Sequence, residues 1–308
     1  MNILITGCLG HIGSSLIRDL PKLSPDVTIY GLDNLSSQRY CSLFNLPKKK
    51  FHFIEADVRG FDFDDILKSI DVVIHLAAIT DATSSFDKAK EVENNNFKST
   101  KVIAEACSKS FTPLICLSST SVYGTQKNGV DEECEINDLN PQSPYAETKL
   151  KEEQFLQKLS KNYGNSITCC RFGTIFGVSS GMRFHTAVNK FCWQAANMQK
   201  LTVWKYAYNQ VRPYLSLLDS SRVFNHIIKK NLFSNYQLYN VVTDNFTVEQ
   251  VVDVIKKYFE NVEIEFVESK IMNQLSYEVF SKKIVDTGFE YKGSLIKSIE
   301  ETHKLLMK

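Results

Sequence analysis

Tyr145 and Lys149 are the residues whose types and spacing most directly suggest chemistry. They lie in the segment "SPYAETKL", residues 143–150, and on a helix residues four apart project from the same face. A free tyrosine has a pKa of about 10 and is a poor base at neutral pH. A lysine ammonium beside the phenol favours the tyrosinate, which can then take a proton from a hydroxyl group. The same spacing also occurs in ordinary surface pairs of a helix, so its meaning depends on what surrounds it.

A second polar segment, "SSTSVYG" at residues 118–124, directly follows an apolar run typical of a buried strand. A serine hydroxyl from this segment can hold the same substrate oxygen that Tyr145 deprotonates.

Gly7, Gly10 and Gly13 stand at a spacing of three between the apolar run "NILIT" and an amphipathic stretch. The early glycines permit a tight turn and a close approach of the backbone to a pyrophosphate, and the later one lets the helix pack on the strand. The helix N-terminus then presents free N–H groups to phosphates. A glycine triplet alone is weak evidence for such a site.

An acidic residue at the expected distance strengthens the prediction. Asp33 lies twenty residues after Gly13, where a carboxylate contacts the ribose hydroxyls of adenosine. It would repel a 2′-phosphate, which favours NAD over NADP; the alternative is an Asp that begins a turn with Asn34. Asp57, in "EADVR", either accepts from the adenine amine or caps a helix.

Short strand-like runs alternate with helical patterns through the first half of the chain. The helices are expected at 88–109 and 144–162, after a first one marked by Ile12, Leu16 and Leu20. Strands that are apolar throughout and separated by helices indicate a parallel sheet covered on both faces, so we predict an α/β doubly wound (Rossmann) fold. The expected strands are 2–6, 27–33, 51–58, 71–78, 113–119 and 166–173.

The alternation degrades after about residue 174. We predict a second, smaller mixed α/β substrate domain over 174–308, and a first domain over 1–173 with return segments near 211–230 and 236–243. Helices are expected near 184–199, 219–230, 247–259 and 294–307, and strands at "LTVW", "VRPYLSLLD", "QLYNVV" and "VEIEFV".

Composition narrows the class of protein. The chain has 308 residues, a net charge of +1 and 43% apolar residues, which suits an enzyme and gives no field that would attract nucleic acid. The eight cysteines form no C-x-x-C pair, so reduced thiols in a cytoplasmic protein are expected, with no metal site. No signal peptide is evident, and the apolar runs are far shorter than the ~20 residues that span a bilayer.

The sequence resembles the extended short-chain dehydrogenases/reductases, specifically the NAD-dependent nucleotide-sugar epimerase/dehydratase family. "TGCLGHIG", "DNLS", "ADVR", "VIHLAA", "SSTSVYG", "YAETK", "RFGTIFG" and "VRPYLSLLD" follow one another in the family's order. The resemblance implies that Ser119, Tyr145 and Lys149 form the catalytic triad and that the second domain holds a nucleotide sugar. The expected contacts to NAD come from Gly7, Gly10, His11, Ile12, Gly13, Asp33, Asn34, Asp57, Val58, Leu76, Ala77, Ala78, Asn96, Tyr145, Lys149 and Phe172.

The resemblance also implies a set of substrate contacts. Asn189 and Arg212 match positions that contact the diphosphate, which suits the forked donors of an arginine. The chain departs from the family at three places. Thr174 stands where many members have Asn, and Val178 replaces the usual Pro. Gln274 and Leu275 stand where many members carry an arginine for the second phosphate. The full expected set is Thr80, Ser119, Thr120, Thr174, Arg183, His185, Asn189 and Arg212.

The residues after Ser119 bear on the reaction. The 4,6-dehydratases of the family carry an Asp-Glu pair there and the decarboxylases a Glu, whereas this chain has Thr120 and Ser121, which cannot act as acids. This leaves 4-epimerisation of a nucleotide sugar as the leading prediction, with a 4-dehydrogenase, for example of a GDP-linked sugar, as the alternative. A 3,5-type epimerase using His185 ranks lower, because Ser121 stands where its cysteine partner would be.

Two further alternatives stay open. One is an NADP-dependent carbonyl reductase, against which Asp33 argues, and the other is a non-catalytic dinucleotide-binding protein, against which the intact triad argues. By analogy with the family, we expect a homodimer formed through helices 88–109 and 144–162.

Overall fold

A seven-stranded parallel sheet forms the centre of the larger part of the molecule. The computed structural model describes residues 1–46, 49–81, 84–268 and 276–307, and the strand order is β10-β6-β5-β4-β1-β2-β3. Every neighbouring pair in this sheet is parallel, and the order reverses between β1 and β4. The strands are β1 (Asn2–Thr6), β2 (Thr28–Asp33), β3 (Phe51–Glu55), β4 (Val72–His75), β5 (Leu114–Ser119), β6 (Ile167–Phe172) and β10 (Tyr236–Val241).

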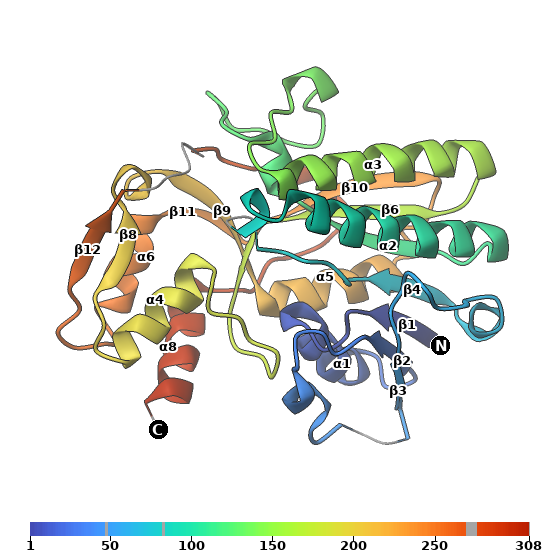
Figure 1. Cartoon of the computed structure of the whole chain (residues 1–308), viewed down its shortest axis with the longest axis horizontal. Coiled ribbons are helices and arrows are strands. Elements are labelled where there is room, and N and C mark those ends of the chain that lie inside the picture. The colour runs from blue at the N-terminus through green and yellow to red at the C-terminus, as the bar shows by residue number, and fades with distance from the viewer. Residues whose placement is uncertain (47–48, 82–83, 269–275, 308) are drawn as a thin grey trace.

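Two helices cover each face of the sheet. In Figure 1, α2 (Ala89–Ser110) and α3 (Pro144–Tyr163) run side by side over one face, while α1 (His11–Leu23) and α5 (Leu217–Lys229) cover the other. The alternation of β1 explains both layers, since Ile3 and Ile5 pack with α1 and α5 while Leu4 packs with α2 and α3. The predicted doubly wound α/β fold is confirmed.

The start of α3 is fixed by local sequence. The Ser143 hydroxyl accepts a hydrogen bond from the Ala146 N–H at 3.2 Å, and Pro144 occupies the first turn. Gly164 ends the helix in the left-handed conformation, with φ of 71°. These signals set Tyr145 in the first turn, at the sheet edge where the strands end.

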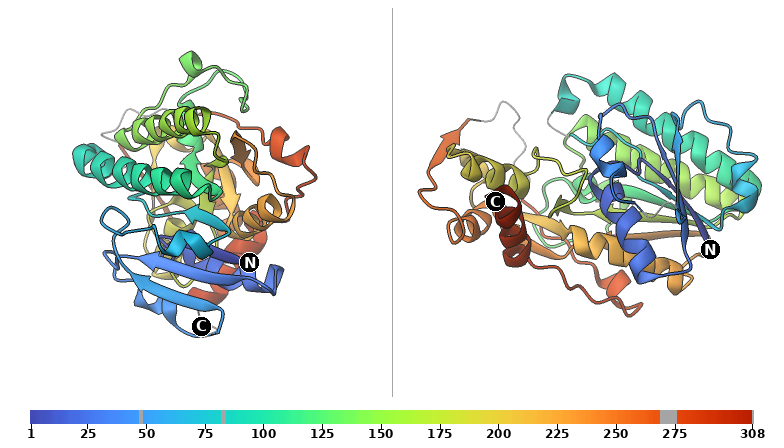
Figure 2. Two further views of the ribbon diagram at one scale, coloured as in Figure 1. Left: turned by 90° about the vertical axis from the view of Figure 1, so that its right-hand side faces the viewer. Right: turned by 90° about the horizontal axis from the view of Figure 1, so that it is seen from below.

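The remaining elements build the smaller part, which lies beside the edge of the sheet where its strands end, as the turned views of Figure 2 show. β9 (Val211–Ser216) pairs in parallel with β7 (Thr174–Phe176) and antiparallel with β11 (Asp244–Thr247). A two-stranded sheet joins β8 (Leu201–Trp204) and β12 (Ile264–Val267). The helices of the smaller part are α4 (Ala187–Ala196), α6 (Val248–Ile255) and α8 (Leu295–Leu306). The short helix α7 (Lys282–Val285) instead packs on β10 of the main sheet, and its Ile284 belongs to the core on the α1 and α5 face.

Some expected boundaries need correction. Of the segments expected to return to the main sheet, β10 joins it and α5 covers it, but residues 211–216 are hydrogen-bonded to β7 and β11 instead. The helix expected over 247–259 ends at Ile255, because the Tyr258 N–H donates to the Ile255 carbonyl at i, i+3 spacing. The helix near 184–199 is shorter, Ala187–Ala196, and β3 ends at Glu55, so that Asp57 lies beyond the strand.

Within the described part of the chain, no helix combines the length and apolar character needed to cross a membrane. The eight cysteines are free thiols.

A buried ion pair ties α3 to β6. The Arg171 guanidinium donates two hydrogen bonds to the Glu153 carboxylate, at 2.9 and 2.7 Å, and both side chains are almost fully buried. The guanidinium also lies 4.7 Å from the centre of the Tyr123 ring, whose hydroxyl donates to Asn240 Oδ1 at 2.9 Å. This network fixes the helix that carries Tyr145 and Lys149 against the sheet.

We predict that Glu153→Gln destabilises the fold by about 3–5 kcal/mol, because it leaves the Arg171 charge buried and uncompensated. Urea unfolding followed by circular dichroism measures the loss. The matched control is Glu300→Gln, which removes the partner of Lys304 in an exposed pair on α8 and should cost less than about 1 kcal/mol. An equal loss in both variants would contradict the role given to the Glu153–Arg171 pair.

Candidate active site

The candidate site lies where β1, β4, β5 and β6 end, at the point where the strand order reverses. Ligands of open α/β sheets bind in this crevice. The predicted residues arrive there from the loops after β1, β2, β4 and β5, from the first turns of α3 and from the segment after β7.

The glycine loop has the geometry that a dinucleotide requires. Gly7 has φ of +66°, and a Cβ on it would lie 2.6 Å from the Ala77 backbone nitrogen, so only glycine fits. A Cβ on Gly13 would lie 2.5 Å from the Gly7 carbonyl oxygen, in the first turn of α1. At Gly10 the nearest atom would be 3.3 Å away and the next 4.0 Å, which leaves room in front of the helix N-terminus. This open cradle of N–H groups fits a pyrophosphate.

Hydrogen bonds from neighbouring loops hold the acidic residues Asp33, at the end of β2, and Asp57, just after β3. Asp33 accepts hydrogen bonds from the Leu9 N–H at 3.1 Å and the Leu35 N–H at 3.0 Å. Asn34 donates to Asp57 at 3.0 Å, and the Arg59 guanidinium donates to both Asp57 oxygens and holds the pKa of that carboxyl well below its usual range. Asp57 thus organises this edge of the sheet, and its contact with adenine stays a prediction.

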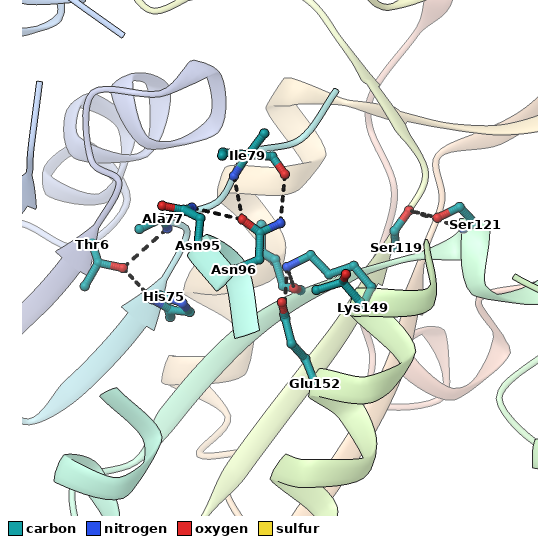
Figure 3. A network of polar contacts seen from close by, with 12 residues as sticks. Thr6, His75, Ala77, Ile79, Asn95, Asn96, Ser119, Ser121, Lys149 and Glu152 are labelled. Carbon is teal, nitrogen blue, oxygen red and sulfur yellow. Dashed lines mark hydrogen bonds and ion pairs between the residues drawn. The ribbon is translucent and has the colours of Figure 1, made fainter. Parts of the chain in front are cut away.

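The loop after β4 is clamped from both sides, as Figure 3 shows. The Thr6 hydroxyl is hydrogen-bonded to His75 Nδ1 at 2.7 Å and accepts from the Ala77 N–H at 3.4 Å. On α2, Asn96 bonds both the N–H and the carbonyl of Ile79 at 2.8 Å. These bonds place the backbone of residues 76–78 beside the glycine loop. The predicted NAD contacts Val58 and Phe172 are buried nearby in the two faces of the core.

The structure brings the predicted catalytic triad together. Ser119 ends β5, and its hydroxyl accepts a hydrogen bond from the Ser121 hydroxyl at 2.9 Å. It lies close enough to Tyr145 to lower the pKa of the phenol. The Lys149 ammonium lies 6.0 Å from the centre of the Tyr145 ring, one turn along α3. A substrate hydroxyl that reaches Tyr145 and Ser119 would meet both an acid/base and a hydrogen-bond partner.

The surroundings of Tyr145 act on its pKa in opposite directions. Burial raises the pKa of the phenol, the Lys149 charge lowers it, and the Glu152 carboxylate raises it again. Arg183 and the Ser119 hydroxyl add smaller lowering effects. In the protein alone the phenol pKa stays above its ordinary value, so Lys149 by itself does not bring Tyr145 to its working pH.

Sequence reasoning missed Glu152. It lies three residues after Lys149, and its Oε2 accepts a hydrogen bond from the Lys149 ammonium at 2.9 Å. The helical spacing i, i+3 was the available signal.

Several cationic or imidazole groups converge on the side of the cleft that faces Tyr145. Arg183 donates from Nη1 to the Thr80 hydroxyl. Arg39 lies close enough for its positive charge to repel that of Arg183 and to lower the pKa of Arg183. Arg39 was not predicted from the sequence. His185 is exposed beside Arg183. The predicted substrate residues Thr80, Arg183 and His185 are therefore together.

A short strap, residues Ser179–Gly181, lies across the glycine loop. Ser179 Oγ is hydrogen-bonded to His11 Nδ1 at 2.7 Å, and the Gly181 N–H donates to Ser14 Oγ at 2.9 Å. The Cys41 thiol donates to the Ser180 carbonyl at 3.1 Å. His11, which was expected to contact NAD, thus joins the cofactor loop to the segment after β7.

Asn189 and Arg212 occupy different surroundings. Asn189 is fully buried; its oxygen accepts from the Gly177 N–H at 3.2 Å and its nitrogen donates to the Arg183 carbonyl at 3.0 Å. Arg212 Nε and Nη2 are buried and have no hydrogen-bond partner among the residues that the structure describes, so they are suited to binding an anion.

The other predicted substrate residues lie on β7, which pairs with the strand of Arg212, and in the turn after β5. Thr174 begins β7 and pairs with Tyr214 of β9, and the Thr120 hydroxyl donates to the Phe172 carbonyl at 3.3 Å. Gln274 and Leu275 lie outside the described residues.

The fold thus holds a glycine loop suited to a dinucleotide and brings Ser119, Tyr145 and Lys149 to the same edge of the sheet. A family model described as the NAD dependent epimerase/dehydratase family matches residues 3–241. The chain belongs to this family, which confirms NAD as the predicted cofactor.

Curated relatives match along almost the whole chain. A trifunctional UDP-glucose 4,6-dehydratase/UDP-4-keto-6-deoxy-D-glucose 3,5-epimerase/UDP-4-keto-L-rhamnose-reductase of Arabidopsis thaliana is 28% identical over 98% of this chain and 46% of its own length. The chain thus spans about half the length of this plant relative. The dTDP-D-glucose 4,6-dehydratase of Homo sapiens is 28% identical over 97% of this chain and 88% of its own.

Among solved structures, the UDP-glucuronic acid 4-epimerase of Bacillus cereus in complex with UDP-glucuronic acid and NAD is similar in fold. Its TM-score is 0.87, with 24% identity over 99% of both chains.

We predict that Gly181→Ala lifts the strap from the glycine loop, because the new Cβ would lie 2.4 Å from the Leu9 carbonyl oxygen. The expected results are a destabilisation of about 1–3 kcal/mol and weaker retention of NAD, measured by thermal unfolding and by calorimetric titration with NAD. Gly60→Ala is the control, since a Cβ there meets nothing within 4 Å. Unchanged NAD affinity in Gly181→Ala would contradict the strap's role.

Two buried histidines make the fold sensitive to acid. Burial lowers the pKa of both His11 and His75 to about 3. The unfolded chain binds these protons near pH 6.5, so the stability is present above that pH and is lost as the pH falls from 6.5 towards 3. At about pH 5.5 each histidine should lower the free energy of unfolding by about 1.4 kcal/mol. Urea unfolding at about pH 7.5 and 5.5 tests this; His11→Gln should remove about half of the difference, and equal pH dependence in that variant would refute it.

Proposed function

We propose that the chain is an NAD-dependent nucleotide-sugar 4-epimerase. The observation that carries the proposal is the assembled set of Ser119, Tyr145 and Lys149, followed by two residues without acidic groups, Thr120 and Ser121. Epimerisation needs one acid/base and one hydride carrier, and this set supplies the former.

Each residue of the set has a separate task. Tyr145 takes the proton of the sugar hydroxyl and returns it after the sugar has turned over, while Ser119 holds the same oxygen by a hydrogen bond. Lys149 favours the ionised phenol through its charge. NAD, which the glycine loop and Asp33 would hold, would supply reversible hydride transfer at the same carbon. No further acid is required, because nothing is eliminated from the sugar.

Dehydration is disfavoured even though several curated relatives are dehydratases. Elimination of water from the sugar requires an additional acid and base. In this chain the Thr120 hydroxyl donates to the Phe172 carbonyl and the Ser121 hydroxyl donates to Ser119. Both hydroxyls serve the structure, and neither titrates in the range that such chemistry needs.

The strap supports an epimerase over a dehydrogenase or an NADP-dependent reductase. An epimerase recovers its oxidised cofactor in each cycle, whereas the other two exchange it. The bonds of Ser179 to His11 and of Gly181 to Ser14 hold a segment over the cofactor loop, which favours a cofactor that stays bound. Asp33 at the end of β2 opposes the 2′-phosphate of NADP.

The substrate side offers anion-binding groups. The unpartnered donors of Arg212 suit the diphosphate of a sugar nucleotide. Arg183 adds a guanidinium on the side of Tyr145, so a sugar that carries a carboxylate, such as the UDP-glucuronic acid of the Bacillus cereus enzyme, belongs among the substrates to test.

The division of labour and the assembly are part of the proposal. Residues 1–173, with α5 and β10, would bind NAD, and most of 174–308 would bind the nucleotide sugar. A homodimer would form through the outer faces of α2 and α3, where Lys151 pairs with Glu93 and covers the Phe97 ring at 4.4 Å.

We expect the protein to interconvert the 4-epimers of one sugar nucleotide without accumulating reduced cofactor. The measurement is incubation with UDP-, GDP-, CDP- and dTDP-sugars, including a uronic acid, followed by NMR of the sugar and by absorbance of reduced nicotinamide. Tyr145→Phe should slow interconversion by at least about a hundredfold while NAD binding persists.

The matched control is Tyr163→Phe, which changes an exposed tyrosine at the other end of α3 and should leave turnover unchanged. If reduced cofactor accumulated together with the product, the protein would be a dehydrogenase and not an epimerase. Full turnover in Tyr145→Phe would refute the assigned acid/base.

A further inference from the structure

Lys149 is part of a buried ion pair. Its ammonium donates to Glu152 Oε2 and to the Leu117 carbonyl, both at 2.9 Å. The side chains of Lys149 and Glu152 are only 6% and 4% exposed. In Figure 3 the Glu152 carboxylate and the Lys149 ammonium point toward one another, beneath the loop that Asn96 clamps.

The pair changes what Lys149 can do for Tyr145. The Lys149 ammonium alone would act on the Tyr145 phenol with its full positive charge. The Glu152 carboxylate, hydrogen-bonded to the same ammonium, cancels part of the electrostatic potential that Lys149 produces at the phenol. Because solvent is excluded from the pair, neither charge is screened by water. Glu152 belongs to the same helix as Tyr145 and acts against the tyrosinate that the reaction needs.

We propose that Glu152 is a positioning residue of the catalytic site, which holds the Lys149 ammonium in place and offsets part of the charge that Lys149 presents to Tyr145. The proposal rests on the proposed function only in giving Tyr145 the role of acid/base. It adds a residue that touches neither the sugar nor the phenol and that acts through Lys149.

The other groups around the pair do not substitute for Glu152. His75 of β4 faces Lys149, but burial lowers its pKa to about 3 and keeps it neutral. The Cys116 thiol of β5 also faces Lys149, and burial raises its pKa well above the ordinary value, so it is neutral too. Glu153 lies next to Glu152, but its carboxylate is committed to Arg171.

Two groups from other elements also face these residues. Thr100 of α2 contributes a hydroxyl beside Glu152. Arg183, from the segment after β7, is a second cation that faces Tyr145 and lowers the pKa of its phenol. The negative charge of Asp81 in turn stabilises the charged form of Arg183. Both groups are retained in every variant below, so a change in Tyr145 can be assigned to Glu152.

The test is the ionisation of Tyr145 in the NAD-loaded protein. Tyrosinate absorbance is titrated with pH, and the same titration of Tyr145→Phe is subtracted to isolate the one phenol. In Glu152→Gln the phenolate should form about one pH unit lower than in the unmodified protein. The pH at which turnover of the sugar nucleotide reaches half its maximum should move in the same direction.

Matched variants separate charge from structure. Glu152→Asp keeps the charge and should titrate as the unmodified protein does, while Glu147→Gln removes an exposed charge in the first turn of α3 and should shift nothing. If Glu152→Gln does not fold, Glu152→Met removes the charge and leaves no polar group of its own unpaired.

The phenolate titration distinguishes the two proposals. An unchanged or higher titration pH in the folded, charge-free variant overturns the role of Glu152, whatever the substrate is. If no sugar nucleotide is turned over, the proposed function fails, but a lower titration pH still supports the role given to Glu152.

Discussion

Close contact between backbone segments at the end of β1 is the constraint on which the site depends. The Gly7 Cα faces the Ala77 backbone so closely that a Cβ would lie 2.6 Å from its nitrogen, and Gly181 approaches the Leu9 carbonyl in the same way. These contacts bring three chain segments together at the N-terminus of α1. Without them the loop after β4 and the strap would stand away from the cofactor loop, and the residues that follow would not converge.

Helix α3 carries two neighbouring carboxylates with different tasks. Glu153 forms an ion pair with Arg171 of β6 and fixes the helix on the sheet. Glu152 forms an ion pair with Lys149, through which we propose that it influences Tyr145. Both pairs are buried, so each charge needs its partner to remain in the interior.

Much of the fold could be predicted from patterns that depend on few residues. Apolar runs fixed the six expected strands of the main sheet, and β10 was expected as a return segment, because a parallel sheet buries both faces of its strands. The triad was predictable because Tyr145 and Lys149 share one helix. The shortened α6 and the separate sheet of β9 were not, because the i, i+3 turn at Ile255 and the pairing of β9 with β7 involve contacts that no local period encodes.

The sequence by itself determined most of the elements, the glycine loop, the acid at the end of β2 and the pair of Tyr145 and Lys149, since each follows from short spacings along the chain. The choice of Ser119 came from the resemblance to the family. Only the tertiary structure decided which polar side chains meet across the fold. Arg183 reaches Thr80 across the cleft, and His11 bonds Ser179 at 168 positions' distance along the chain. Burial then set the strength of each interaction, because a side chain's pKa depends on the water and charges around it, and folding alone brings those together.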